Sequence, residues 1–186
     1  MNTTSTIPVM DKLVIYQIFT RLFGNQNTTN QPGGSRDENG VGKLNDISYE
    51  ALRELKTFGA SHVWYTGLIE HATTTDYSAH GIPANDPAVV KGRAGSPYAI
   101  SDYYDIAPDL AVNVPNRMAE FEALVERTHT AGLKVIIDFV PNHVARQYHS
   151  DAKPAGVIDL GEKDDTSVGF SPKNNFYYLP GQLFVA

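Results

Sequence analysis

The amino-acid sequence predicts an α/β fold built on a parallel β-sheet. Two observations support this prediction: the order strand, helix, strand, and its repetition further along the chain. In both copies an amphipathic helix ends at a glycine, Gly59 or Gly132, and an apolar strand follows. Strands that are apolar on both faces are typical of parallel sheets covered by helices. We therefore expect repeated βα units.

The first unit begins with a strand. The run Leu13 to Phe19 is rich in β-branched and aromatic residues, which indicates β-structure. A helix is expected to begin after Ser48, a good N-cap, and to end before Gly59, since leucines follow at helical spacing. The run SHVWYTGLI, residues 61–69, indicates the next strand.

The second unit follows a long irregular connection. Residues 66–113 are rich in Gly, Pro, Asp and Ser and show no convincing period, although four tyrosines argue for order. A helix is expected to begin near Pro115-Asn116, with apolar residues at helical spacing up to Gly132. Lys134 to Phe139 then indicates the third strand.

The chain after this strand predicts a small inserted domain. Strand-like runs flank a Pro180-Gly181 turn within residues 144–186. Three strands make an incomplete sheet, because a (β/α)8 TIM barrel has eight strands and typically about 250 residues. We therefore expect an N-terminal extension (1–12), the first three βα units of a (β/α)8 barrel (13–143), and the truncated start of the inserted domain. An open doubly wound sheet is the alternative.

Composition excludes several function classes. The chain of 186 residues carries a formal net charge of −6, which disfavours binding to nucleic acid or to an anionic membrane. The absence of cysteine excludes disulfides and thiolate metal sites. No apolar run approaches the roughly 20 residues that span a bilayer, and no signal peptide is visible. We expect a soluble protein, either cytoplasmic or secreted with its leader removed.

Polar residues follow the third predicted strand, at Asp138, Asn142 and His143. Active sites gather at the carboxyl ends of parallel strands, so these side chains should face one basin. Three interpretations stay open on this evidence: hydrogen bonds that hold the strand end, a metal site formed with His149, or part of a carbohydrate pocket.

The run DFVPNH, residues 138–143, resembles the first short sequence block of the α-amylase family, glycoside hydrolase family 13. Further segments are similar to the family in the same order: VIYQIFTRLF, LRELKTFGASHVWYT, GSPYAISDYYDIAPDL and THTAGLKVIIDFVPNH. The similarity covers most of Leu13 to His143. It implies a (β/α)8 barrel with a small domain inserted after the third strand, acting on α-glucosidic bonds with retention.

The resemblance also implies roles for single residues. Tyr98 matches a tyrosine that stacks on the sugar ring beside the cleaved bond, and its alternative is a core tyrosine with a capped hydroxyl. His143 matches a histidine that hydrogen-bonds a sugar hydroxyl. Asp138 matches an aspartate that supports the strand end, and we expect Asp102 to anchor the loop that carries Tyr98. Asn142 matches a position that gives calcium a side-chain oxygen in many members.

One metal loop is not expected. Some members carry a calcium loop after the first strand, which Asp37-Glu38-Asn39-Gly40 matches only faintly. Val41 and Lys43 stand where acidic ligands would be needed. Calcium therefore remains a possible cofactor only through Asn142.

The chain contains no match to the family's catalytic carboxylates. Retaining glycosidases need two carboxyl groups about 5 to 5.5 Å apart, and in the family these follow the fourth and fifth strands. We expect a retaining hydrolase or transglycosylase of starch-type or malto-oligosaccharide substrates whose first 186 residues alone are inactive. The alternatives are a non-catalytic carbohydrate-binding or interaction protein on a degenerate barrel and, third, a metal-dependent hydrolase.

Overall fold

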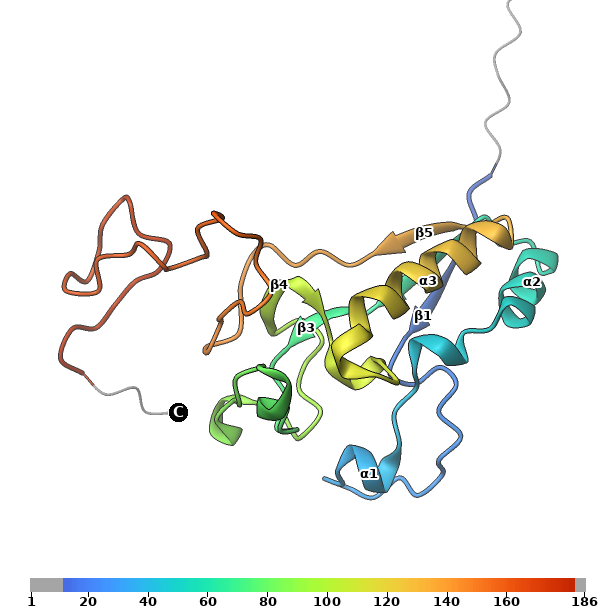
Figure 1. Ribbon diagram of the computed structural model, residues 1–186, viewed down its shortest axis with the longest axis horizontal. Helices are drawn as coiled ribbons and strands as arrows, with labels where there is room; N and C mark the ends of the chain where they lie inside the picture. Colours follow the sequence, from blue (N-terminus) through green and yellow to red (C-terminus); the bar gives the residue numbers. More distant parts are fainter. Residues whose placement is uncertain (1–11, 183–186) are drawn as a thin grey trace, which may run out of the picture.

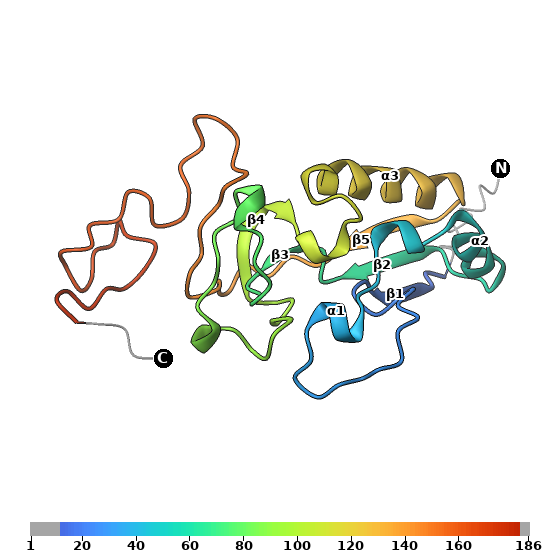
Figure 2. The ribbon, with the colours of Figure 1, turned by 60° about the horizontal axis from the view of Figure 1, so that its bottom comes forward.

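The computed structural model describes residues 12–182. Its central feature is a parallel sheet of three strands, β1 (Ile15–Phe19), β2 (His62–Thr66) and β5 (Lys134–Ile137), in the order β1-β2-β5 (Figure 2). The predicted parallel α/β sheet is confirmed. Except for its last residue, the predicted N-terminal extension lies outside the described residues.

Two helices pack on this sheet and form the main core with it. The first, α2 (Tyr49–Thr57), begins at the predicted N-cap, where the Ser48 hydroxyl accepts a hydrogen bond from the Ala51 amide at 3.2 Å. The second, α3 (Arg117–Thr130), lies along the sheet in both views (Figures 1 and 2). The buried core joins these elements through Leu52, Val63, Tyr65, Leu124 and Leu133.

A buried polar contact fixes α3 against the sheet. The Tyr65 hydroxyl of β2 lies 2.6 Å from the Thr128 hydroxyl of α3, and both side chains are fully buried. A buried hydroxyl without a partner is costly, so this pair favours one position of the helix.

The sequence predicts a sheet covered on both faces, but residues 12–182 leave part of the sheet exposed. Ile15 of β1 is 50% exposed and Ile137 of β5 is 45% exposed. The described residues leave these apolar side chains open because nothing in residues 12–182 packs over them. Apolar strand residues left open in this way indicate surface that further structure could cover.

The predicted irregular stretch contains a second sheet, which is a correction. β3 (Ile69–His71) and β4 (Ile100–Ile106) pair antiparallel. β4 escaped sequence detection because three of its buried residues, Ser101, Asp102 and Asp105, are polar, so the strand shows no apolar period. The connections hold α1 (Arg36–Asn39) and five short 3-10 helices, at Leu44–Asp46, Ser78–His80, Pro87–Val89, Pro108–Leu110 and Val114–Asn116.

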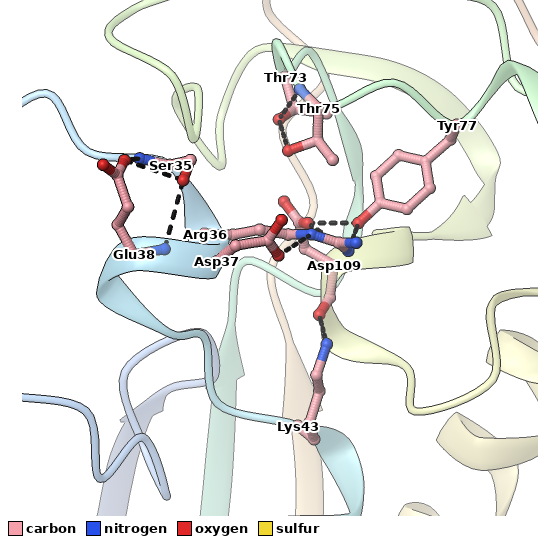
Figure 3. A network of polar contacts seen from close by, with 9 residues as sticks. All are labelled: Ser35, Arg36, Asp37, Glu38, Lys43, Thr73, Thr75, Tyr77 and Asp109. Carbon is pink, nitrogen blue, oxygen red and sulfur yellow. Dashed lines mark hydrogen bonds and ion pairs between the residues drawn. The ribbon is translucent and has the colours of Figure 1, made fainter.

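A polar network links the connection after β1 to the connection that contains β4 (Figure 3). Tyr77 is buried and donates its hydroxyl hydrogen to Asp109. Arg36 of α1 donates to the Tyr77 oxygen, and Lys43 Nζ donates to the Asp109 carbonyl at 2.6 Å. Burial, reinforced by the Asp109 carboxylate, raises the pKa of Tyr77. The network thereby ties the connection after β1 to the one that contains β4.

The predicted strands around Pro180-Gly181 are not formed within the described residues. From residue 144 to residue 182 the chain runs through turns; residues 145–152 lie against β4, and the later part extends away from the rest of the molecule (Figure 1). Its internal order comes from Asp164, whose carboxylate accepts hydrogen bonds from the amides of Asn175 and Phe176 and from the Tyr178 hydroxyl. The rest of the predicted strand-like run, residues 183–186, lies outside the described part.

None of the helices in residues 12–182 has the length and apolar character needed to cross a membrane.

Candidate functional site

A large open cleft lies beyond the carboxyl end of β5. Its volume is about 1840 Å³, and both Asn142 and His143 line it, together with several aromatic side chains. Phe139 follows the strand, Tyr103 belongs to β4, and Tyr148 comes from the segment after β5. The predicted convergence of polar residues at this edge is therefore present for Asn142 and His143.

The turn that carries His143 is held by Tyr103. The Tyr103 hydroxyl lies within hydrogen-bonding reach of the Val140 carbonyl and of the His143 carbonyl, the latter at 3.3 Å. The Tyr103 ring packs against Phe139 and Tyr148, with centroid separations of 5.7 and 5.8 Å. Partial burial raises the pKa of Tyr103, so its hydroxyl keeps the hydrogen that it donates.

His143 presents an exposed ring to the cleft. Its Nδ1 lies 3.0 Å from the Asn142 side-chain oxygen. An Nδ1–H that donates to this oxygen would leave Nε2 as the hydrogen-bond acceptor for a ligand hydroxyl. The pair can therefore bind a hydroxyl-rich ligand through the histidine while the asparagine fixes the tautomer.

Asp138 lies directly after β5 and joins two neighbouring strands. Its Oδ1 accepts a hydrogen bond from the indole N–H of Trp64 on β2. Its Oδ2 is buried and has no hydrogen-bond partner among the residues that the structure describes. Asp138 does not line the cleft, and its predicted supporting role remains a prediction.

Tyr98 is not brought together with His143. It is 43% exposed, which does not fit the alternative of a core tyrosine, and it is absent from the cleft lining formed by residues 12–182. Its backbone amide contacts the Ser96 hydroxyl at 3.3 Å. The predicted stacking role of Tyr98 is thus left as a prediction.

Asp102 anchors a different segment from the one we expected. The side chain is fully buried, and Oδ1 accepts from the Tyr104 amide at 2.7 Å. Oδ2 accepts from the amides of Asp151 and Ala152 at 3.0 and 3.2 Å. The carboxylate therefore holds the chain after β5 against β4, and none of these bonds reaches the loop that carries Tyr98.

The alternative metal site of Asp138, His143 and His149 is not formed. Within residues 12–182, no three histidine or acidic side chains converge into a group that could hold a metal ion. Calcium prefers six to eight oxygen ligands, and the Asn142 oxygen already contacts a histidine nitrogen. The described residues alone therefore do not fit a calcium site at Asn142.

Sequence reasoning missed Tyr103 and Trp64 as supporting residues. Trp64 is the single tryptophan of the chain, and its partner Asp138 lies 74 residues away. Tyr103 holds a turn some 40 residues further along. The signal in the sequence was that Tyr103 stands beside Asp102 in a tyrosine-rich run. Because strand β4 was not predicted, the turn that Tyr103 contacts could not be predicted either.

The fold and the cleft together define a class of protein. It is an α/β protein with a parallel sheet and an open, aromatic-lined cleft at the carboxyl end of a strand, where ligands of such folds bind. The model of the alpha amylase catalytic domain matches residues 17–171. The chain belongs to the α-amylase family.

Several named proteins are similar to this chain. Trehalose-6-phosphate hydrolase of Bacillus subtilis (strain 168) is 31% identical over 164 residues, which cover 88% of this chain and 23% of the relative. Alpha-amylase MalA of Haloarcula japonica is 29% identical over 135 residues, or 73% of this chain and 15% of the relative. The solved alpha-amylase of Geobacillus thermoleovorans, complexed with acarbose, gives a TM-score of 0.49 at 26% identity, covering 73% and 24% of the two chains.

The chain thus spans about a quarter or less of the length of these relatives. Other relatives with similar sequences are cyclomaltodextrin glucanotransferases, for example that of Bacillus licheniformis, which is 27% identical over 181 residues.

Proposed function

We propose that this chain is the N-terminal part of a retaining glycoside hydrolase or transglycosylase that acts on α-glucosidic bonds of starch-type or malto-oligosaccharide substrates. The observation that carries the proposal is the match of residues 17–171 to the family's catalytic domain, in a chain whose His143 and Asn142 line an aromatic cleft. The α-glucan is the expected partner.

The cleft lining suits a sugar. A pyranose offers an apolar face to an aromatic ring and hydroxyls to polar groups. Tyr103 and Phe139 provide rings, and His143 provides a ring nitrogen for a hydroxyl. In the proposed enzyme Tyr98 stacks on the sugar beside the cleaved bond, and Asp138 supports the strand end.

We place residues 13–143 in the first part of a (β/α)8 barrel and residues 144–186 in the start of an inserted domain. The half-exposed apolar side chains Ile15 and Ile137 support this assignment, because further strands of a barrel would cover the open sheet. The greater length of the relatives also supports it.

Catalysis requires carboxylates beyond those found here. Three acidic side chains line the cleft, Asp86, Asp159 and Glu162. Each of these carboxylates already accepts a hydrogen bond from another group of the protein. The hydrogen bond from the Asp159 amide lowers the pKa of Glu162, opposite to the shift that a general acid needs. We therefore propose that the 186-residue chain alone is inactive. No step is assigned to calcium, whose binding at Asn142 stays a prediction.

The test compares two proteins, the 186-residue chain and the longer protein that continues past it. Both are incubated with maltoheptaose, and NMR follows the anomer released. We expect turnover with retention by the longer protein and none by the chain alone. A longer protein that inverts the anomer would refute the retaining mechanism. A longer protein that binds maltoheptaose in calorimetry without turnover would refute the enzyme proposal and favour the non-catalytic binding protein.

A further inference from the structure

Glu70 of β3 is a buried carboxyl group that the proposed sugar site does not use. Glu70 is only 3% exposed. Oε1 accepts a hydrogen bond from the Ser101 hydroxyl at 3.1 Å, whereas Oε2 is buried and has no partner in the described part of the chain. An ionised carboxylate in such a position is strongly disfavoured.

The charges around Glu70 are mostly negative. Asp102 and Asp105 belong to the neighbouring strand β4, and Asp151 comes from the segment after β5. The nearby cation is Arg117 of α3, which pairs with Asp105 and lies 3.7 Å from the Asp151 carboxylate. With every group ionised, Glu70 would be surrounded by three further negative charges.

Two further titratable neighbours, His71 and Tyr148, do not supply a positive charge at neutral pH. His71, the next residue on β3, is buried, and burial lowers its pKa. Tyr148 and His149 line a cavity of about 210 Å³ beside Glu70. Burial raises the pKa of Tyr148, which therefore stays neutral.

The segment Ala145–Ala152 closes over this cavity and docks on β4 through its backbone. The Ala145 amide donates to the Ile100 carbonyl at 2.7 Å, and the His149 amide donates to the Ser101 carbonyl at 3.0 Å. The last two amides of the segment donate to the Asp102 carboxylate. Docking therefore covers the partnerless oxygen of Glu70 and brings the Asp151 carboxylate near enough to disfavour a charge on Glu70.

We propose that Glu70 is a protonation-controlled clasp: as a neutral carboxylic acid it lets the segment Ala145–Ala152 dock on β4, and loss of its proton favours release of that segment. The segment begins two residues after His143, so the clasp governs one wall of the cleft. The inference concerns the described residues only and does not depend on the proposed enzymatic activity.

The direction of the pH effect follows from proton linkage. Burial, with the neighbouring carboxylates, raises the pKa of Glu70 to about 8, and release of the segment returns the group to water and to an ordinary value near 4.5. Between these values the docked state binds a proton that the released state has lost. Docking is therefore strongest at low pH, weakens about tenfold per pH unit through this window, and levels off above about pH 8.

Hydrogen exchange of the full chain tests the clasp. The protection factors of the His149, Asp151 and Ala152 amides are measured by NMR at pH 5.5 and 7.5 and corrected for intrinsic exchange rates. We expect protection to fall roughly 50-fold over this interval. Glu70→Gln keeps the shape without the charge and should abolish the fall, whereas Glu54→Gln, at an exposed position of α2, should retain it.

Three results would overturn the proposal. The first is constant protection in the unmodified chain, and the second is an undiminished pH dependence in Glu70→Gln. The third is an equal fall at the Leu124 and Thr128 amides of α3, since this would mean that Glu70 acts on the whole fold and not on the docked segment.

Discussion

Replacement of Asp102 by asparagine is expected to loosen the chain after β5 with little change in side-chain volume. The asparagine oxygen can still accept from the Tyr104 amide, but the new NH₂ group would face the amides of Asp151 and Ala152. Two hydrogen bonds to a charged acceptor are lost, each contributing roughly 1.5 to 3 kcal/mol. Relief of repulsion with the Asp151 carboxylate offsets part of this loss, so we expect a net destabilisation of about 3 kcal/mol.

Urea unfolding followed by the fluorescence of Trp64, the single tryptophan, measures the global effect of Asp102→Asn. Hydrogen exchange at Asp151 and Ala152 measures the local effect. The matched control is Asp37→Asn, whose side chain is 87% exposed and which should leave the midpoint unchanged. A loss below about 0.5 kcal/mol, with protection intact at both amides, would refute the assignment of Asp102 as the anchor.

Other substitutions test the packing around the site. Arg117→Met should destabilise the fold by about 3 kcal/mol in urea unfolding, because it leaves the buried Asp105 carboxylate without a cation and removes the contact with Asp151. Arg53→Met, at an exposed helix position, should be nearly neutral, and equal effects would contradict the ion-pair argument. Gly95→Ala should be far more harmful to the melting temperature than Gly92→Ala. Both glycines have positive φ, but only at Gly95 would the new Cβ overlap a backbone atom, the Ala72 carbonyl oxygen. Similar melting temperatures would count against that close approach.

Local signals were enough to predict the parallel sheet and its helices. The N-cap Ser48 and Gly59 lie within two residues of the ends of α2. Gly132 likewise lies two residues after the end of α3. Leucines at helical spacing point into the core because burial of that face stabilises the helix.

Long-range contacts could not be predicted in the same way. β4 carries buried Ser101 and Asp102, whose partners come from segments 31 and 49 residues distant, and a polar strand has no apolar period. The region before Pro180 has β-prone residues but forms turns in the described chain, because it finds no strand to pair with. Propensity for β-structure has little effect without a partner.

At the candidate site, Asn142 and His143 could be placed in the cleft from their position after an apolar strand. The anchoring role of Asp102 could not be assigned correctly, because its acceptor oxygens face amides that are distant in sequence. The support from Tyr103 was likewise hidden, since it depends on the undetected strand β4.

The most direct test of the proposed sugar site is the kcat/KM of the longer protein for maltoheptaose before and after His143→Ala. A hydrogen bond to the sugar that contributes about 1.4 to 2.7 kcal/mol to transition-state binding predicts a fall of about 10- to 100-fold. His129→Ala, at an exposed position of α3 outside the cleft lining, should leave kcat/KM unchanged. A value for His143→Ala within about twofold of the unmodified enzyme would contradict the assignment of this cleft as the sugar site.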